Sequence, residues 1–152
     1  MTITYEPLIA EIAQTVFSTM AQLELTQVDV ASCSDHDCLL TSIHIAGDWT
    51  GSVVVSLSSG AARQASAAML GISVDEVSES DRREVASELT NIIGGNLKSL
   101  LPGTSFLSLP TTISGHDFEM HVRNAVQIDD VVMSCEAGLL RLRLYARDDH
   151  ET

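Results

Sequence analysis

The sequence predicts an α/β protein of the α+β sandwich type, in which helices pack on a mostly antiparallel sheet. Three observations carry this prediction. The segments follow the order of one helix, three strands, two helices and several further strands. Each half contains strands close enough in sequence to pair as hairpins. The last strand segment alternates apolar with polar residues, which is typical of a sheet with one covered face. The two hairpin-containing halves leave an internal duplication open, but their sequences match too poorly to assert one.

The first half begins with an amphipathic helix predicted over residues 6–23, because its apolar residues recur at steps of three and four. That stripe consists of Leu8, Ile9, Ile12, Val16, Phe17, Met20 and Leu23. A short strand is expected over 25–32. Two strands at 39–46 and 51–58 follow, and the glycine-bounded turn between them predicts a hairpin.

The second half begins with an Ala-rich helix predicted over 60–70, which Gly71 ends. The longest helix is predicted over 79–101, because Ser78 and Asp81 have the spacing of a capping box. The remaining segments are predicted to be strands, over residues 105–113, 117–124, 126–135 and 138–147.

The composition bounds the class of protein. A chain of 152 residues is expected to form one domain, spanning 1–152. Its 21 acidic residues against 8 Lys and Arg give a net charge of −13, which argues against binding nucleic acid or an anionic membrane surface. No apolar run is long enough to span a bilayer, and the N-terminus lacks the basic start of a secretory signal. We therefore expect a cytoplasmic protein, and the three cysteines are expected to be reduced thiols.

The helix predicted over 79–101 carries a narrow polar stripe. At about 100° per residue, Glu84, Glu88, Asn91, Gly95 and Lys98 fall on one side, opposite the apolar residues. A solvated helix face would explain the charged members. It does not explain two adjacent glycines, each of which costs about 1 kcal/mol relative to alanine. The glycines indicate close approach by another backbone or by a partner surface.

The segment from Ser87 to Lys98 resembles the active helix of the CheX/CheC/FliY family of phosphatases, which act on the phosphorylated chemotaxis regulator CheY. Its signature is Glu, two residues, Asn, an apolar pair and Gly, found here from Glu88 to Gly94. Three further segments resemble CheX in particular: residues 5–20, 47–71 and 108–115. The resemblance therefore covers about residues 5–147.

This resemblance implies a CheC-like fold and a phosphatase that hydrolyses the aspartyl phosphate of a receiver domain. Asn91 would orient the attacking water, and Glu88 would pair with the active-site lysine of the receiver. The partner-docking residues would be Glu84, Gly94, Gly95 and Lys98. The receiver would hold the Mg²⁺, so the chain is expected to need no metal or cofactor of its own. A homodimer joined through sheet edges is also implied. Glu84 stands where the wider family has Asp or Ser.

Two other functions stay open. The first is a non-catalytic scaffold or receiver-binding module of the same fold. The second is a metal or redox protein built on Cys33, His36 and Cys38, although their spacing matches no usual zinc pattern and a polar hairpin loop explains the segment more simply.

Several side chains outside the stripe also carry expectations. Asn96 is expected to be a buried structural amide, and Trp49 a lid over the core rather than a contact anchor. Arg141 and Arg143 either pair with local acids or line a dimer contact. Because receiver active sites are acidic like this chain, docking is expected to be weak and to tighten as salt rises.

Overall fold

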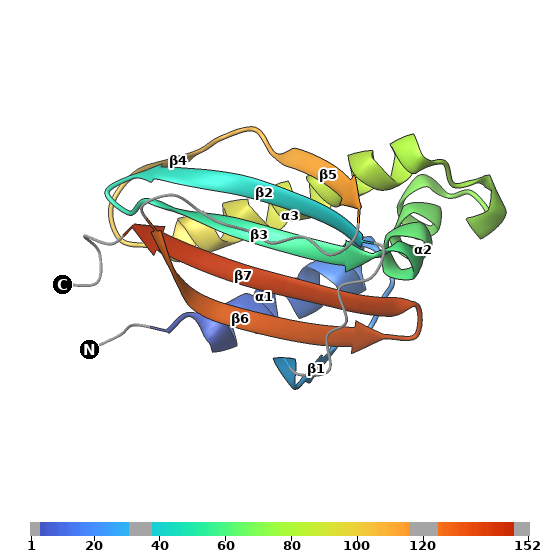
Figure 1. Cartoon of the computed structure of the whole chain (residues 1–152), viewed down its shortest axis with the longest axis horizontal. Coiled ribbons are helices and arrows are strands. Elements are labelled where there is room, and N and C mark those ends of the chain that lie inside the picture. The colour runs from blue at the N-terminus through green and yellow to red at the C-terminus, as the bar shows by residue number, and fades with distance from the viewer. Residues whose placement is uncertain (1–3, 31–37, 116–124, 148–152) are drawn as a thin grey trace.

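The computed structural model describes residues 4–30, 38–115 and 125–147, and it contains three α-helices on one antiparallel sheet. The helices are α1 (Glu6–Met20), α2 (Ser59–Leu70) and α3 (Glu79–Leu100), with a 3₁₀ turn, η2 (Val74–Glu76), between the last two. The strands are β1 (Thr26–Val28), β2 (Cys38–Gly47), β3 (Gly51–Ser58), β4 (Ser105–Leu107), β5 (Thr111–Gly115), β6 (Ala125–Cys135) and β7 (Gly138–Arg147). Figure 1 shows α1 and α3 behind the sheet and α2 at one end of it. The predicted α+β sandwich is confirmed.

The order of strands in the sheet reveals two similar halves. The order is β1-β6-β7-β3-β2-β4, and β5 also pairs with β2. Each half thus supplies a helix on the same face, a hairpin at the centre of the sheet, and edge strand pairing beside the hairpin of the other half. The topology therefore supports the internal duplication that the sequences of the halves could not establish.

The core lies between the sheet and the helices. Alternate residues of β7 (Leu140, Leu142 and Leu144) are almost completely buried against the helices, whereas Arg141 and Arg143 point to the opposite face. Phe17 of α1 and Leu89 of α3 are equally buried on the helix side. The alternation predicted for the last strand is confirmed.

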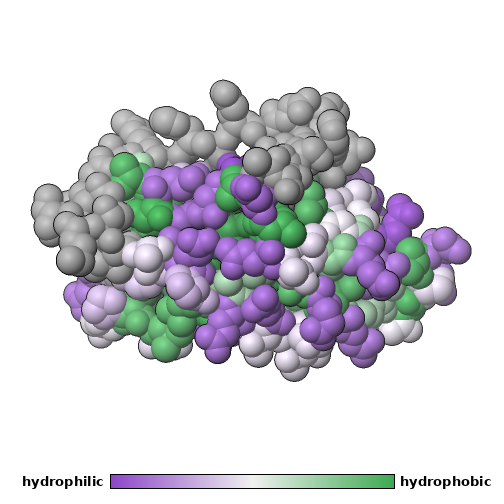
Figure 2. Space-filling model, turned by 90° about the horizontal axis from the view of Figure 1, so that it is seen from below, coloured by the Kyte–Doolittle hydropathy of each residue, from purple (hydrophilic) through white to green (hydrophobic). Residues whose placement is uncertain are grey.

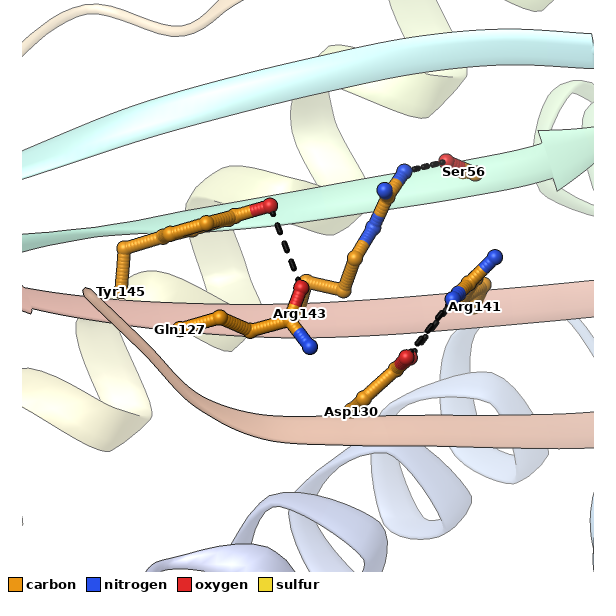
Figure 3. A network of polar contacts seen from close by, with 6 residues as sticks. All are labelled: Ser56, Gln127, Asp130, Arg141, Arg143 and Tyr145. Atoms are coloured by element: carbon orange, nitrogen blue, oxygen red, sulfur yellow. Dashed lines mark hydrogen bonds and ion pairs between the residues drawn. The ribbon is translucent and has the colours of Figure 1, made fainter. Parts of the chain in front are cut away.

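Polar side chains on the face opposite the helices tie three strands together (Figure 3). Arg141 donates to both carboxylate oxygens of Asp130, with Nε–Oδ1 at 2.9 Å and Nη2–Oδ2 at 2.6 Å. Arg143 donates to the Ser56 hydroxyl at 3.4 Å, and Tyr145 donates to Gln127 at 3.3 Å. For Arg141, pairing with a local acid is the observed alternative.

The N-terminal end of α1 is held by a buried carboxylate. Asp129 of β6 is only 6% exposed and accepts hydrogen bonds from the Thr4 hydroxyl at 2.6 Å and the Tyr5 amide at 2.8 Å. The Tyr5 ring meets Trp49 edge-on, with 6.4 Å between centroids. Trp49 is buried, which confirms the expected lid over the core. On the side formed by α1, β1 and β6, hydrophilic residues are interspersed with small apolar areas (Figure 2).

Three predicted boundaries were wrong, and the strand expected over 25–32 is the shorter β1. Helix α1 ends at Met20 rather than 23, because Gln22 takes a left-handed φ of 55° and the Leu23 amide bonds the Phe17 carbonyl. The apolar period continued past this end because Leu23 still packs on the core.

The strand predicted over 105–113 is two strands, β4 and β5. Pro110 between them has no amide hydrogen to donate to a ladder. The Ser108 amide donates to the His44 carbonyl, and the Ser108 hydroxyl accepts from the His44 amide at 3.0 Å, which bridges the break. The strand predicted over 117–124 lies outside the described residues. Among the helices described, none is long and apolar enough to cross a membrane.

Candidate functional site

Helix α3 has a capped N-terminus and is buried on one side only. Ser78 and Asp81 form a reciprocal capping box, with both hydrogen bonds at 3.0 Å, as the spacing predicted. Its buried side includes Val85, Leu89 and Ile93, which pack in the main core. The opposite side is left to solvent, so α3 can present side chains to another molecule.

A chain of hydroxyl groups anchors α3 to strand β5. The Ser87 and Thr112 hydroxyl oxygens lie 2.7 Å apart, and Thr112 also meets the buried Thr41 hydroxyl at 3.0 Å. The Arg83 guanidinium donates to the Thr112 carbonyl at 3.0 Å. Thr112 therefore fixes α3 at the residue immediately before Glu88. Sequence reasoning missed Ser87 and Thr112, and the only signal was the family-like segment 108–115.

The predicted polar stripe forms a continuous line on α3. Glu84, Glu88 and Asn91 are exposed, and Gly95 and Lys98 are half-buried. Within the described residues, none of the four polar side chains of the stripe takes part in a hydrogen bond or ion pair. Other polar side chains of the same helix do have partners in the chain: Ser87, Thr90, Asn96 and Ser99. The unused polar groups of α3 thus gather on one stripe.

The two glycines of α3 have different explanations. Gly94 is buried, and a Cβ there would lie 3.0 Å from the Ile43 Cγ2 atom of β2. Its missing side chain lets the helix approach its own sheet, which corrects the expectation that Gly94 forms part of the docking surface. A Cβ at Gly95 would meet only Leu107 Cδ1, at an ordinary 3.8 Å. Packing against the described part of the chain therefore does not explain why Gly95 is a glycine.

Asn96 was wrongly expected to be buried. It is exposed, and its Nδ2 donates to the Ile92 carbonyl at 2.9 Å. Leu100, which the helical angle places on the apolar side, is 57% exposed. The elements that cover α3 therefore stop short of this flank at its C-terminal end.

Two of the three residues considered for a metal site lie outside the part of the chain that the structure describes. Cys33 and His36 lie outside the described residues, whereas Cys38 and Cys135 are half-buried. In the described ranges, no group of three or more His, Cys, Asp or Glu side chains is placed to hold a metal ion.

The arrangement on α3 limits the chemistry that it can perform. Glu88 and Asn91 lie one helical turn apart on an exposed face, where they enclose no small molecule in the way that a concave site does. An amide there can orient a water molecule through its oxygen or its NH₂ group. The stripe can therefore present these groups to a reacting group on another macromolecule.

Comparisons with known proteins agree on one family. The profile of the family described as "Chemotaxis phosphatase CheX" matches residues 39–136. The crystal structure of CheX from Vibrio vulnificus is similar, with 19% identity, a TM-score of 0.78, and coverage of 93% of this chain and 95% of that one. CheX from Desulfovibrio desulfuricans is 22% identical, with a TM-score of 0.76 and coverage of 91% and 96%.

A third similar structure contains a partner. It is the CheX-CheY-BeF₃-Mg²⁺ complex from Borrelia burgdorferi, with 16% identity, a TM-score of 0.71, and coverage of 96% of this chain and 99% of that one. No curated protein matches the chain.

Proposed function

The chain belongs to the family of the chemotaxis phosphatase CheX, and from that premise we propose that it hydrolyses the aspartyl phosphate of a CheY-like response-regulator receiver domain. The observation that carries the proposal is the pair formed by Glu88 and Asn91. Both side chains are exposed on α3, one turn apart, and neither has a partner within the described part of the chain. The rest of the reacting site would come from the receiver.

Asn91 positions the attacking water in this proposal. The water oxygen bonds to phosphorus while the bond from phosphorus to the aspartyl oxygen breaks, and the aspartate leaves as a carboxylate with the bonding electrons. An amide is too weak a base to take a proton from the attacking water. That proton passes to the phosphate product and to solvent. The contribution of Asn91 is therefore orientation, which is the main task of a protein in phosphoryl transfer.

Glu88 docks the receiver in this proposal, by pairing with a lysine of its active site. The complex of CheX with CheY from B. burgdorferi supports a partner of this class. Any Mg²⁺ that the reaction needs would be held by the receiver, so we expect no metal requirement in this chain itself. A receiver partner also leads us to propose a cytoplasmic location.

The test compares Asn91→Ala with Asn96→Ala, a matched control that removes an exposed amide elsewhere on α3. Each variant is incubated with phosphorylated receivers from the same cell, and phosphate release and receiver binding are measured. We expect Asn91→Ala to lose hydrolysis but keep binding, Glu88→Ala to weaken binding, and Asn96→Ala to do neither. Undiminished hydrolysis by Asn91→Ala would refute the mechanism. Binding without hydrolysis by the unmodified chain would favour the non-catalytic scaffold.

We also propose a homodimer through the β4–β5 edge of the sheet. Three exposed large apolar side chains gather there: Phe106 (69% exposed), Leu109 (88%) and Ile113 (44%). Apolar side chains on a sheet edge favour pairing with another chain. Light scattering after size exclusion should give twice the chain mass, and Leu109→Asp should shift it to the monomer. Leu70→Asp, which changes an exposed leucine of α2, should leave the dimer intact.

A further inference from the structure

The stripe on α3 continues two turns beyond Asn91 to Lys98, whose side chain has no partner among the residues that the structure describes. Lys98 is the only lysine of the chain, and its side chain makes no hydrogen bond or ion pair within the described ranges. The positions where a helical ion pair would need an acid hold Gly94, Gly95, Leu101 and Pro102.

Other cations in the described part of the chain are used internally. Arg82 donates to Ser59, Arg83 pairs with Glu79, and Arg141 pairs with Asp130. Arg63 is the other described cation without a recorded contact, and it is exposed on α2, away from the stripe. Among the described cations, Lys98 alone combines an unused positive charge with a place on the face that carries Asn91.

Gly95 leaves the helix surface open between Asn91 and Lys98. Replacing Gly95 by alanine would cause no clash with the described residues, because the nearest atom would lie 3.8 Å from the new Cβ. Glycine inside a helix is less favourable than alanine, and no contact with the described residues offsets this cost. We call this position without a side chain the bare step. It would let the backbone of a docked molecule approach the helix closely.

The stripe therefore has a fixed order of charge along α3. Its N-terminal part is acidic, with Glu84 and Glu88, the amide of Asn91 follows, and Lys98 ends it. The receiver would present a lysine to Glu88 and its phosphoryl group to Asn91. Lys98 lies about 10 Å further along the helix axis, so it would face the part of the receiver surface next to the phosphoryl group. Because the reacting site of a phosphorylated receiver is itself anionic, an acidic group there would complete the match.

We propose that Lys98 contacts an acidic group beside the receiver's phosphorylation site, across the bare step at Gly95, and so fixes the direction in which the receiver docks. This inference rests on the proposed phosphatase function. Lys98 is a docking residue that selects partners and orients them, whereas Asn91 acts on the water.

The first experiment replaces Lys98 by Met and by Arg, and measures KM and kcat with phosphorylated receiver at low salt. Lys98→Met should raise KM about tenfold, the effect of losing a favourable charge contact, and should change kcat far less. Lys98→Arg should recover most of the loss. If Lys98 only complements the helix dipole, Lys98→Met will lower the melting temperature slightly and leave KM unchanged, which overturns the proposal.

The second experiment exchanges the two ends of the stripe. The double variant Glu84→Lys/Lys98→Glu keeps the net charge of the chain but reverses the charge order, and it should lower receiver affinity by at least about tenfold. The matched control is Glu11→Lys/Arg63→Glu, which exchanges exposed charges on α1 and α2 and should bind normally. Equal affinities for the two double variants would contradict a directional contact.

The third experiment replaces Gly95, where we expect stability to improve while receiver binding weakens. Gly95→Ala should raise the melting temperature by about 2–4 °C and yet raise KM, because the added methyl group separates the surfaces. Asn96→Ala serves as the control for helix propensity, off the stripe. A more stable Gly95→Ala with unchanged KM would remove the close approach. If Asn91→Ala abolishes hydrolysis while all Lys98 and Gly95 variants behave as the unmodified chain does, this inference fails and the phosphatase stands.

Discussion

Helices α1 and α3 occupy equivalent places in the two halves of the fold but differ in how they use their polar side chains. Both pack on the same face of the sheet, and each precedes an edge strand and a central hairpin. On α1, polar groups bond nearby backbone or side chains: Gln14 to the Leu25 carbonyl, Ser18 to Glu24, and Glu6 to Gln27. On α3, the stripe residues have no such partners within the described ranges.

The buried residues of the two helices allow their positions to be matched. Ile9, Ala13, Phe17 and Ala21 recur every four residues along α1 and its cap, as Leu89, Ile93, Leu97 and Leu101 do along α3. Matching these series places Leu8 and Glu11 opposite Glu88 and Asn91, and Thr15 and Ser18 opposite Gly95 and Lys98. The comparison teaches that two helices in equivalent places carry different side chains at the positions of the stripe, and that Glu88, Asn91, Gly95 and Lys98 have no like counterparts on α1.

The largest effect would come from moving the pair to the other helix. In an Asn91→Ala chain, Leu8→Glu with Glu11→Asn places Glu and Asn on α1. Hydrolysis should stay about two to three orders of magnitude below that of the unmodified chain, the usual loss when one positioned group is removed, because the receiver is proposed to dock on α3 and not on α1. Recovery of a tenth of the activity would break the comparison. Melting curves would show that the variant is folded.

Removing Asp129 tests α1 as a structural helix. Asp129→Ala leaves the Tyr5 amide and Thr4 hydroxyl without their acceptor, and should lower the free energy of unfolding by about 2 kcal/mol. The turnover of the folded protein should change less than twofold. Asp75→Ala, at an exposed acid, should leave stability unchanged. A matching loss of turnover in folded Asp129→Ala would mean that α1 takes part in the reaction.

Thr112→Val tests how tightly α3 is positioned. The variant keeps the shape of the side chain but removes the hydroxyl that meets Ser87 and Thr41. Unfolding should become easier by about 1 kcal/mol, and hydrolysis should fall severalfold as the turn carrying Glu88 loosens. Thr111→Val, on the exposed neighbour in β5, should do neither. Unaltered hydrolysis in Thr112→Val would show that α3 needs no anchor at β5.

Salt should have the smallest effect. The chain carries a net charge of −13, so an acidic receiver is repelled at long range, and its affinity should rise about twofold as surface charges are screened. The gap between the unmodified chain and Lys98→Met should narrow over the same range, because the contact of Lys98 is attractive. Titration calorimetry at several salt concentrations measures both. A steep fall of affinity with salt would mean that the partner is basic.

The sequence predicted those features that depend on neighbours along the chain. The capping box at Ser78, the hairpin around Trp49 and the alternation in β7 are local patterns, and all three are confirmed. The stripe on α3 followed from helical periodicity alone. The end of α1 escaped prediction because a left-handed Gln22 overrides an apolar period that continues to Leu23.

Other features depend on contacts that are distant in sequence. The difference between Gly94 and Gly95 is set by Ile43 and Leu107, and the anchoring of Ser87 is set by Thr112. Asn96 was misplaced because a helical angle says which way a side chain points but not how far the covering elements extend. Sequence reasoning proposed the stripe residues, whereas only the fold shows which of their side chains lack a partner among the described residues.

The exchange of edge strands between the halves has a consequence for how the chain folds. Thr26 pairs with Ser134, and Gly47 pairs with Ser105, so neither half can complete its sheet from its own segment. Forming contacts this far apart in sequence costs loop-closure entropy before the contacts stabilise the chain. Folding is therefore slow, and we expect it to be a single cooperative event. A fragment that ends after α2 should therefore stay unfolded. Strands from both halves are therefore needed to complete the sheet on which α3 packs.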